Sequence, residues 1–188
     1  FQLWANLPAN LKMTPPRYQE VKNLDIPEVT EDDGTKVRLV CGSFWGKRGP
    51  VDGIAADPIY IDVSVPPGKR KTLPVETSRS AFAYVFAGSG KFCNTSGPLA
   101  VPTESVGWAD THPPVQADNR SLILFDRGDE VTVLAGDEGI RFLLVSGKPL
   151  QEPVAWYGPI VMNTQAQLRE AFEELEDGTF LKTKNGGR

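Results

Sequence analysis

The clearest structural signal in the chain is the segment Ile59-Tyr60-Ile61-Asp62-Val63-Ser64-Val65-Pro66-Pro67-Gly68. Apolar residues stand at every second position from Ile59 to Val65, which is the period of a half-buried β-strand. The Pro-Pro-Gly sequence that follows favours a turn over a continued strand. The segment therefore predicts a strand over 59–65 that ends in a tight turn at Gly68.

Similar short segments recur along the middle of the chain. Val37, Leu39 and Cys41 alternate with Arg38 and Val40, and this again indicates a half-buried strand. Further strands are expected at 81–87, 91–93, 122–125, 130–134 and 141–145, separated by turns rich in Gly, Pro and Asp. Many short strands at this spacing indicate an all-β sandwich or barrel.

One helix is expected near the C-terminal end. Thr164 can cap its first turn, Gln167 completes a capping box, and Gly178 ends it. The apolar stripe of this helix consists of Leu168, Ala171, Phe172 and Leu175. Such a stripe needs a partner surface.

Composition excludes several classes of protein. The 188 residues include 20 Lys and Arg against 24 Asp and Glu, a net charge of −4, with no basic run longer than Lys69-Arg70-Lys71. Direct binding to nucleic acid is therefore not expected, and no segment is typical of a membrane span or signal peptide. Cys41 and Cys93 lie in predicted strands, which favours buried free thiols and a cytoplasmic location, with a nuclear one open for a eukaryotic protein.

The turns of a metal-binding barrel are present without its ligands. Cupin barrels bind a metal through G-x5-H-x-H-x3-4-E-x6-G, followed later by a second motif with one more histidine. Aligning the first motif on Gly68 places Pro74 and Glu76 at the histidine positions and Gly88 at the closing glycine, and the second motif places Val131 at its histidine. Proline and valine side chains have no lone pair to donate. No metal site, and no cofactor, is expected in this chain.

Longer segments carry a more specific resemblance. They are Phe1-Gln2-Leu3-Trp4-Ala5-Asn6-Leu7-Pro8, Met13, Pro16-Arg17-Tyr18-Gln19-Glu20, Gly147-Lys148-Pro149-Leu150 with Glu152-Pro153-Val154, and Gly158-Pro159 with Val161-Met162-Asn163-Thr164. Together they closely resemble the pirin family. The resemblance implies a bicupin, whose N-terminal barrel binds iron through three histidines and a glutamate and whose C-terminal barrel is free of metal. No segment here matches the iron-ligand motif, so none of those ligands is carried over.

The resemblance also implies a division of the chain. Residues 1–34 would be the last strand of an N-terminal cupin barrel, over 1–7, plus a linker. Residues 35–147 would form a metal-free C-terminal cupin barrel, a double-stranded β-helix or jelly roll. Residues 148–188 would form a crossing segment, the C-terminal helix and a flexible tail.

Three functions stay open. The leading hypothesis is a non-catalytic cupin domain with a structural and partner-binding role, its partners being the N-terminal cupin domain, another copy of the chain, a regulatory protein or a metabolic enzyme. The second is part of an iron-dependent enzyme similar to quercetin 2,3-dioxygenase, with its active site in the N-terminal barrel. The third is a metal-independent small-molecule site in this barrel, lined by Glu76, Tyr84, Trp108 and Arg141.

Each of these residues also has a structural interpretation. Glu76 fits a solvated turn, and Tyr84 fits a barrel-filling aromatic. The single histidine, His112, is flanked by Pro113 and fits a loop residue better than a ligand or base. Trp156 and Tyr157 precede a Gly-Pro turn, where an aromatic pair is expected to anchor a crossing segment.

Overall fold

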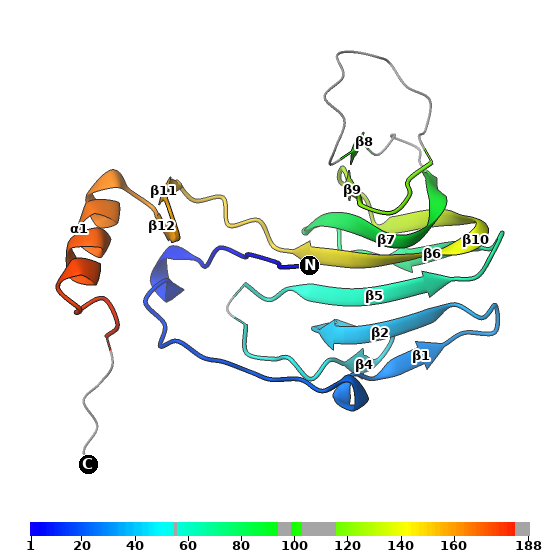
Figure 1. The fold of residues 1–188 in the computed structure, drawn as a ribbon, viewed down its shortest axis with the longest axis horizontal. Helices are drawn as coiled ribbons and strands as arrows, with labels where there is room; N and C mark the ends of the chain where they lie inside the picture. Colours follow the sequence, from blue (N-terminus) through cyan, green and yellow to red (C-terminus); the bar gives the residue numbers. More distant parts are fainter. Residues whose placement is uncertain (55, 94–98, 103–115, 183–188) are drawn as a thin grey trace. The chain divides into compact units, whose positions relative to one another are not determined.

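The computed structural model describes residues 1–54, 56–93, 99–102 and 116–182 (Figure 1). The chain divides into two compact units. The sheet unit comprises Val21–Pro149, and the terminal unit comprises Phe1–Glu20 together with the chain from Leu150 onward. Each unit is described by itself below.

The sheet unit is built around an eight-stranded sheet. Its strands are β1 (Glu28–Thr30), β2 (Lys36–Cys41), β5 (Ile59–Val65), β6 (Arg70–Pro74), β7 (Ser80–Cys93), β8 (Leu99–Pro102), β9 (Ser121–Leu124) and β10 (Glu130–Gly147). They run in the order β1-β2-β5-β10-β7-β9-β8, and β6 pairs with β10. A short hairpin of β3 (Ser43–Phe44) and β4 (Lys47–Arg48) follows β2, and a 3-10 turn, η2 (Asn23–Asp25), precedes β1.

Strand β10, yellow in Figure 1, folds the sheet over on itself. Its first part, 130–134, pairs with β6, its second part, 140–146, pairs with β5, and both parts pair with β7. The register shifts between Ala135 and Ile140. Gly88 and Gly139 lie at this shift with φ of +66° and +79°, a region of backbone conformation that favours glycine.

The inner face of the curled sheet carries the core. Strand alternation directs Ile61, Val63 and Val65 inward, and each is at most 3% exposed. The ring of Phe142 lies edge-on to that of Phe92, with centroids 5.2 Å apart, a favoured aromatic geometry. Other members of this core are Val37, Leu39, Phe44, Leu73, Ala83, Val85, Ala117, Ile123, Val131, Val133, Ala135, Ile140 and Leu144.

The terminal unit joins the two ends of the chain. It contains the 3-10 turn η1 (Ala9–Leu11), the hairpin of β11 (Ala155–Tyr157) and β12 (Ile160–Met162), and helix α1 (Gln165–Glu176). The backbone N–H of Ala9 donates to the Glu152 carboxylate at 2.8 Å. The core of this unit is small and consists of Ala155, Ile160, Leu168 and Ala171, with Met162, Phe172 and Phe180 packed against it.

The predicted helix is confirmed in detail. The Thr164 hydroxyl accepts a hydrogen bond from the Gln167 backbone N–H at 3.2 Å, and the Gln167 side chain accepts from the Thr164 backbone N–H at 3.1 Å. Gly178 follows the helix with φ of +72°. Of the predicted apolar stripe, Leu168 is buried but Leu175 remains 49% exposed.

The predicted strands are mostly correct, but their lengths differ. The strand over 59–65 is found with the expected bounds, whereas 81–87 and 91–93 belong to one strand, β7, and 130–134 and 141–145 belong to one strand, β10. Residues 1–7, expected as a strand, form none in this structure, because a strand needs a pairing neighbour. The linker expected between residue 7 and residue 34 contains η1, η2 and β1.

Candidate functional site

The positions of the cupin metal motif do not form a metal site. Pro74 ends β6 opposite Glu130, and Val131 lies in the core at 5% exposure. Glu76 is exposed in the loop after β6. Within the described ranges, no group of three or more His, Cys, Asp or Glu side chains could hold a metal ion. Because these positions offer one carboxylate, they do not fit the iron that the fold family implies.

The closing glycine of the motif has a structural role instead. A Cβ on Gly88 would lie 2.1 Å from the carbonyl oxygen of Gly139. The two backbones therefore approach closely where β7 crosses the bend of β10, and only glycine fits there.

Glu76 borders a polar pocket of about 320 Å³ in the sheet unit. The Arg79 side chain, 6% exposed, lies between Asp57 at 2.8 Å and Glu76 at 3.2 Å. Burial disfavours the charged Arg79 guanidinium, but its hydrogen bonds to Asp57 and Glu76 outweigh this effect and raise its pKa. The pocket is also lined by Cys41, whose thiol pKa is raised by burial. The Arg79 guanidinium thus pairs with both carboxylates, which is the arrangement of a structural ion-pair cluster.

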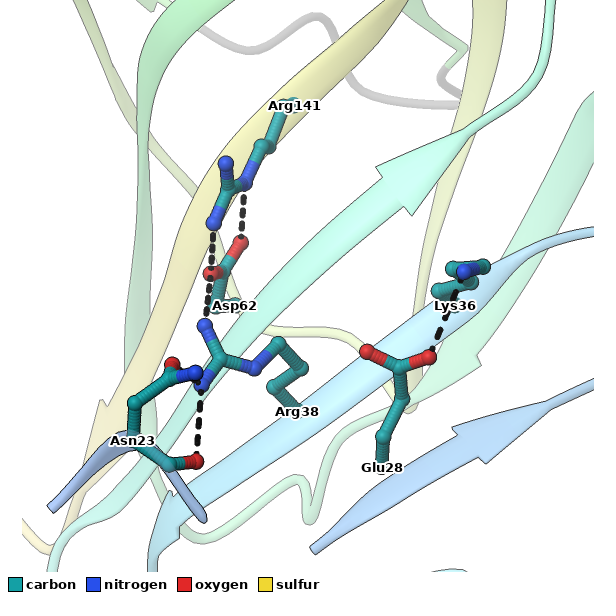
Figure 2. A network of polar contacts seen from close by, with 6 residues as sticks. All are labelled: Asn23, Glu28, Lys36, Arg38, Asp62 and Arg141. Carbon is teal, nitrogen blue, oxygen red and sulfur yellow. Dashed lines mark hydrogen bonds and ion pairs between the residues drawn. The ribbon is translucent and has the colours of Figure 1, made fainter. Parts of the chain in front are cut away.

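Arg141 belongs to a different face of the sheet unit (Figure 2). It points away from the core and donates two hydrogen bonds to Asp62, at 2.9 and 2.6 Å. Hydrogen bonding to Asp62 raises the pKa of Arg141. Asp62 also faces Arg38 at 3.8 Å, and Arg38 donates in turn to Asn23. On the same face, Lys36 pairs with Glu28 at 3.4 Å.

Of the four residues predicted to line one small-molecule site, the three that the structure describes do not come together. Tyr84 is flanked in β7 by Ala83 and Val85, both fully buried in the core, so alternation places Tyr84 on the outer face. Arg141 lies on an outer face as well, and Glu76 lies in the loop pocket. Trp108, like His112, lies outside the described residues. The sequence interpretation supposed that Tyr84 and Arg141 line the barrel interior. Both instead lie on its outside.

A buried cation at the inner face was not predicted. Lys71 alternates with the exposed Arg70 and Thr72 in β6, and its side chain is 10% exposed. Its ammonium pairs with Glu31 and Asp33 and lies 5.3 Å from the ring centroid of Trp45. Burial lowers the pKa of Lys71, but hydrogen bonds to the two carboxylates outweigh it and the pKa is raised. The two-residue spacing of Lys71 and Leu73, which places both side chains on one face of the strand, was the available sequence signal.

The terminal unit carries two open pockets that meet at Trp156. A mostly apolar groove of about 550 Å³ is lined by Trp4, Ala5, Asn6, Leu7, Lys12, Trp156, Pro159, Ile160, Val161, Met162, Leu175 and Phe180. A second pocket of about 460 Å³ lies beside helix α1. Trp156 and Tyr157 are 70% and 72% exposed. The sequence interpretation expected this pair to anchor a crossing segment, but both side chains are exposed on the surface of the unit.

The curled antiparallel sheet with its enclosed apolar core defines a cupin fold. A crystal structure of quercetin 2,3-dioxygenase from Acinetobacter baumannii matches it with a TM-score of 0.75 and 28% identity, over 94% of this chain and 55% of that one. Residues 60–181 match the family model of the pirin C-terminal cupin domain. The chain therefore belongs to the pirin family.

Curated relatives agree with this assignment. A pirin-like protein of Caulobacter vibrioides is 37% identical over 96% of this chain and 58% of its own length. Pirin-1 of Arabidopsis thaliana is 33% identical over 98% of this chain and 57% of its own length. The chain thus spans somewhat more than half the length of these relatives. In the part of the chain that the structure describes, no helix has the length and apolarity to cross a membrane.

Proposed function

We propose that this chain is the metal-free, non-catalytic cupin domain of a two-domain pirin-like protein, and that its role is structural and partner-binding. The observation that carries the proposal is the chemistry at the metal-motif positions. Pro74 and Val131 stand at two of the three histidine positions. Glu76 stands at the remaining one and forms an ion pair with Arg79. A cupin metal site needs several imidazole or carboxylate ligands converging on one ion.

The full-length protein, in this proposal, carries its iron and any oxygen chemistry in another cupin domain. The similarity to a quercetin 2,3-dioxygenase over 55% of that enzyme's chain supports this second candidate for the protein as a whole. This chain's residues would then support the fold of the enzyme without touching the substrate. A reducing cytoplasmic location belongs to the proposal, because Cys41 is a buried free thiol.

Iron analysis of the purified chain tests the proposal. The chain is incubated with ferrous iron under anaerobic conditions, desalted and analysed for metal, and is assayed for quercetin consumption in air beside the Acinetobacter baumannii enzyme. We expect far less than one iron per chain and no quercetin consumption above buffer. One tightly bound iron per chain, or turnover of quercetin, would refute the metal-free assignment.

A further inference from the structure

Exposed apolar side chains are concentrated in the terminal unit. Among the residues that the structure describes, nine of the twelve large apolar side chains found exposed lie in this unit, which is much the smaller of the two. They are Phe1, Trp4, Met13, Tyr18, Val154, Trp156, Tyr157, Leu175 and Leu181. This concentration of exposed apolar side chains in one small unit favours an interaction site there.

The pocket beside α1 has a more specific composition than the groove. Three aromatic rings line it, from Trp156, Tyr157 and Phe172. The Tyr157 and Phe172 rings stand 5.6 Å apart at 61°, so they form two walls of a corner. The indole N–H of Trp156 donates to the Gly158 carbonyl at 2.7 Å, which fixes the third ring.

Acidic side chains complete the pocket. Glu173 and Glu176 line it from α1, and both are exposed. The lining also includes one cation, Arg169, against these two carboxylates, which leaves one net negative charge. The remaining surface therefore combines aromatic faces with negative charge, which is the chemistry that recognises organic cations.

We infer that this aromatic pocket binds an arginine or lysine side chain of a protein partner, with apolar side chains of the same partner lying in the adjoining groove. Trp156 lines both pockets, so one continuous partner surface can reach both. A free small cation fits less well, because Trp156 and Tyr157 stay 70% and 72% exposed and small-molecule sites enclose most of their ligand. The inference rests on the partner-binding part of the proposed function and names the partner's chemistry.

The test uses the whole chain labelled with ¹⁵N at tryptophan, so that the Trp156 indole N–H reports on the pocket by NMR, assigned with Trp156→Phe. The probes are the peptide Ac-Leu-Arg-Leu-NH2, the same peptide with citrulline in place of arginine, and tetramethylammonium chloride. Citrulline keeps the shape of arginine and removes its charge. We expect the arginine peptide to shift the Trp156 signal with saturation. The citrulline peptide should bind at least roughly 5-fold more weakly.

Matched variants separate the pocket from general helix charge. Glu173→Gln with Glu176→Gln removes the two lining charges, whereas Glu170→Gln removes an exposed charge of α1 outside the pocket. The double variant should weaken the arginine peptide by roughly 5-fold or more, and Glu170→Gln should leave its affinity within about 2-fold.

Three outcomes would overturn the inference. They are equal binding of the arginine and citrulline peptides, equal effects of the double variant and of Glu170→Gln, and binding of tetramethylammonium as tight as that of the arginine peptide, which would indicate a small-molecule site. Iron binding by this chain would refute the metal-free assignment and leave this result standing, so the two failures are distinguishable.

Discussion

One carboxylate, that of Asp62, connects three strands on the outer face of the sheet unit. It accepts two hydrogen bonds from Arg141 in β10 and faces Arg38 in β2 at 3.8 Å, while its own side chain is 11% exposed. The alternation over 59–65 predicts an outward-facing side chain at this position and says nothing of its burial. Two long cationic side chains cover the carboxylate, and their placement depends on strand order, which a single sequence does not reveal.

Replacing Asp62 by Asn tests this contact. The variant keeps the shape and removes the charge that both guanidiniums share, and since Arg141 remains 43% exposed, we expect the free energy of unfolding to fall by about 1–2 kcal/mol in urea titrations. Asp126→Asn changes an exposed aspartate in the same unit and should alter the same quantity by at most about 0.5 kcal/mol. Equal effects of the two variants would show that the Asp62 contacts contribute nothing.

At the scale of elements, the long strands β7 and β10 explain most of what the sequence predicts and misses. The segments 81–85 and 141–145 are short, mostly apolar runs, so these parts were predicted. Gly88 and Gly90 in β7, and Gly136 and Gly139 in β10, read as turns in the sequence, yet in the structure they are where paired strands bend. A glycine at a bend and a glycine in a turn look the same without knowledge of the neighbouring strand.

Gly88→Ala tests the bend directly. The new Cβ would lie 2.1 Å from the Gly139 carbonyl oxygen at a φ of +66°, so we expect a loss of at least about 3 kcal/mol in the free energy of unfolding, or no soluble protein. Gly147→Ala is the matched control, because nothing lies within 4 Å of its new Cβ, and it should unfold within about 1 kcal/mol of the parent. A Gly88→Ala chain as stable as the Gly147→Ala chain would contradict the close approach.

The candidate site was harder to predict than the fold. The lack of ligand chemistry at Pro74 and Val131 could be read from the sequence by aligning the cupin motif with it, because that motif fixes the ligand positions. The aromatic pocket could not be predicted, since it combines two consecutive residues of β11, Trp156 and Tyr157, with the helix residue Phe172. Helix and hairpin were each partly visible in the sequence, but their mutual packing was not. The exposure of the aromatic pair is therefore the main correction to the sequence interpretation.

At the scale of the whole molecule, the two units differ in how much apolar core they contain. Among the residues that the structure describes, the core cluster of the sheet unit holds eighteen buried apolar residues, including Phe142, Leu39 and Ile61, whereas that of the terminal unit holds four. Its helix of 12 residues is of a length that is marginal in water without tertiary packing. The terminal unit should therefore open more easily than the sheet unit.

Native-state hydrogen exchange measures this difference. We expect the amides of α1 to exchange through openings that cost less free energy than those of β5 and β10, by at least about 2 kcal/mol. Leu168→Ala, which truncates a side chain 5% exposed in the terminal core, should lower the α1 values by about 2–3 kcal/mol or melt the helix, and leave β10 unchanged. Ile61→Ala should lower the values of β5 and β10.

If Leu168→Ala instead lowers the opening free energies of all elements equally, the chain unfolds as one cooperative body. The terminal unit would then keep its exposed apolar surface without opening more easily than the sheet unit. Local opening confined to α1 would mean that a partner bound at Trp156 also stabilises the helix, since whatever binds only the folded form shifts the opening equilibrium toward it.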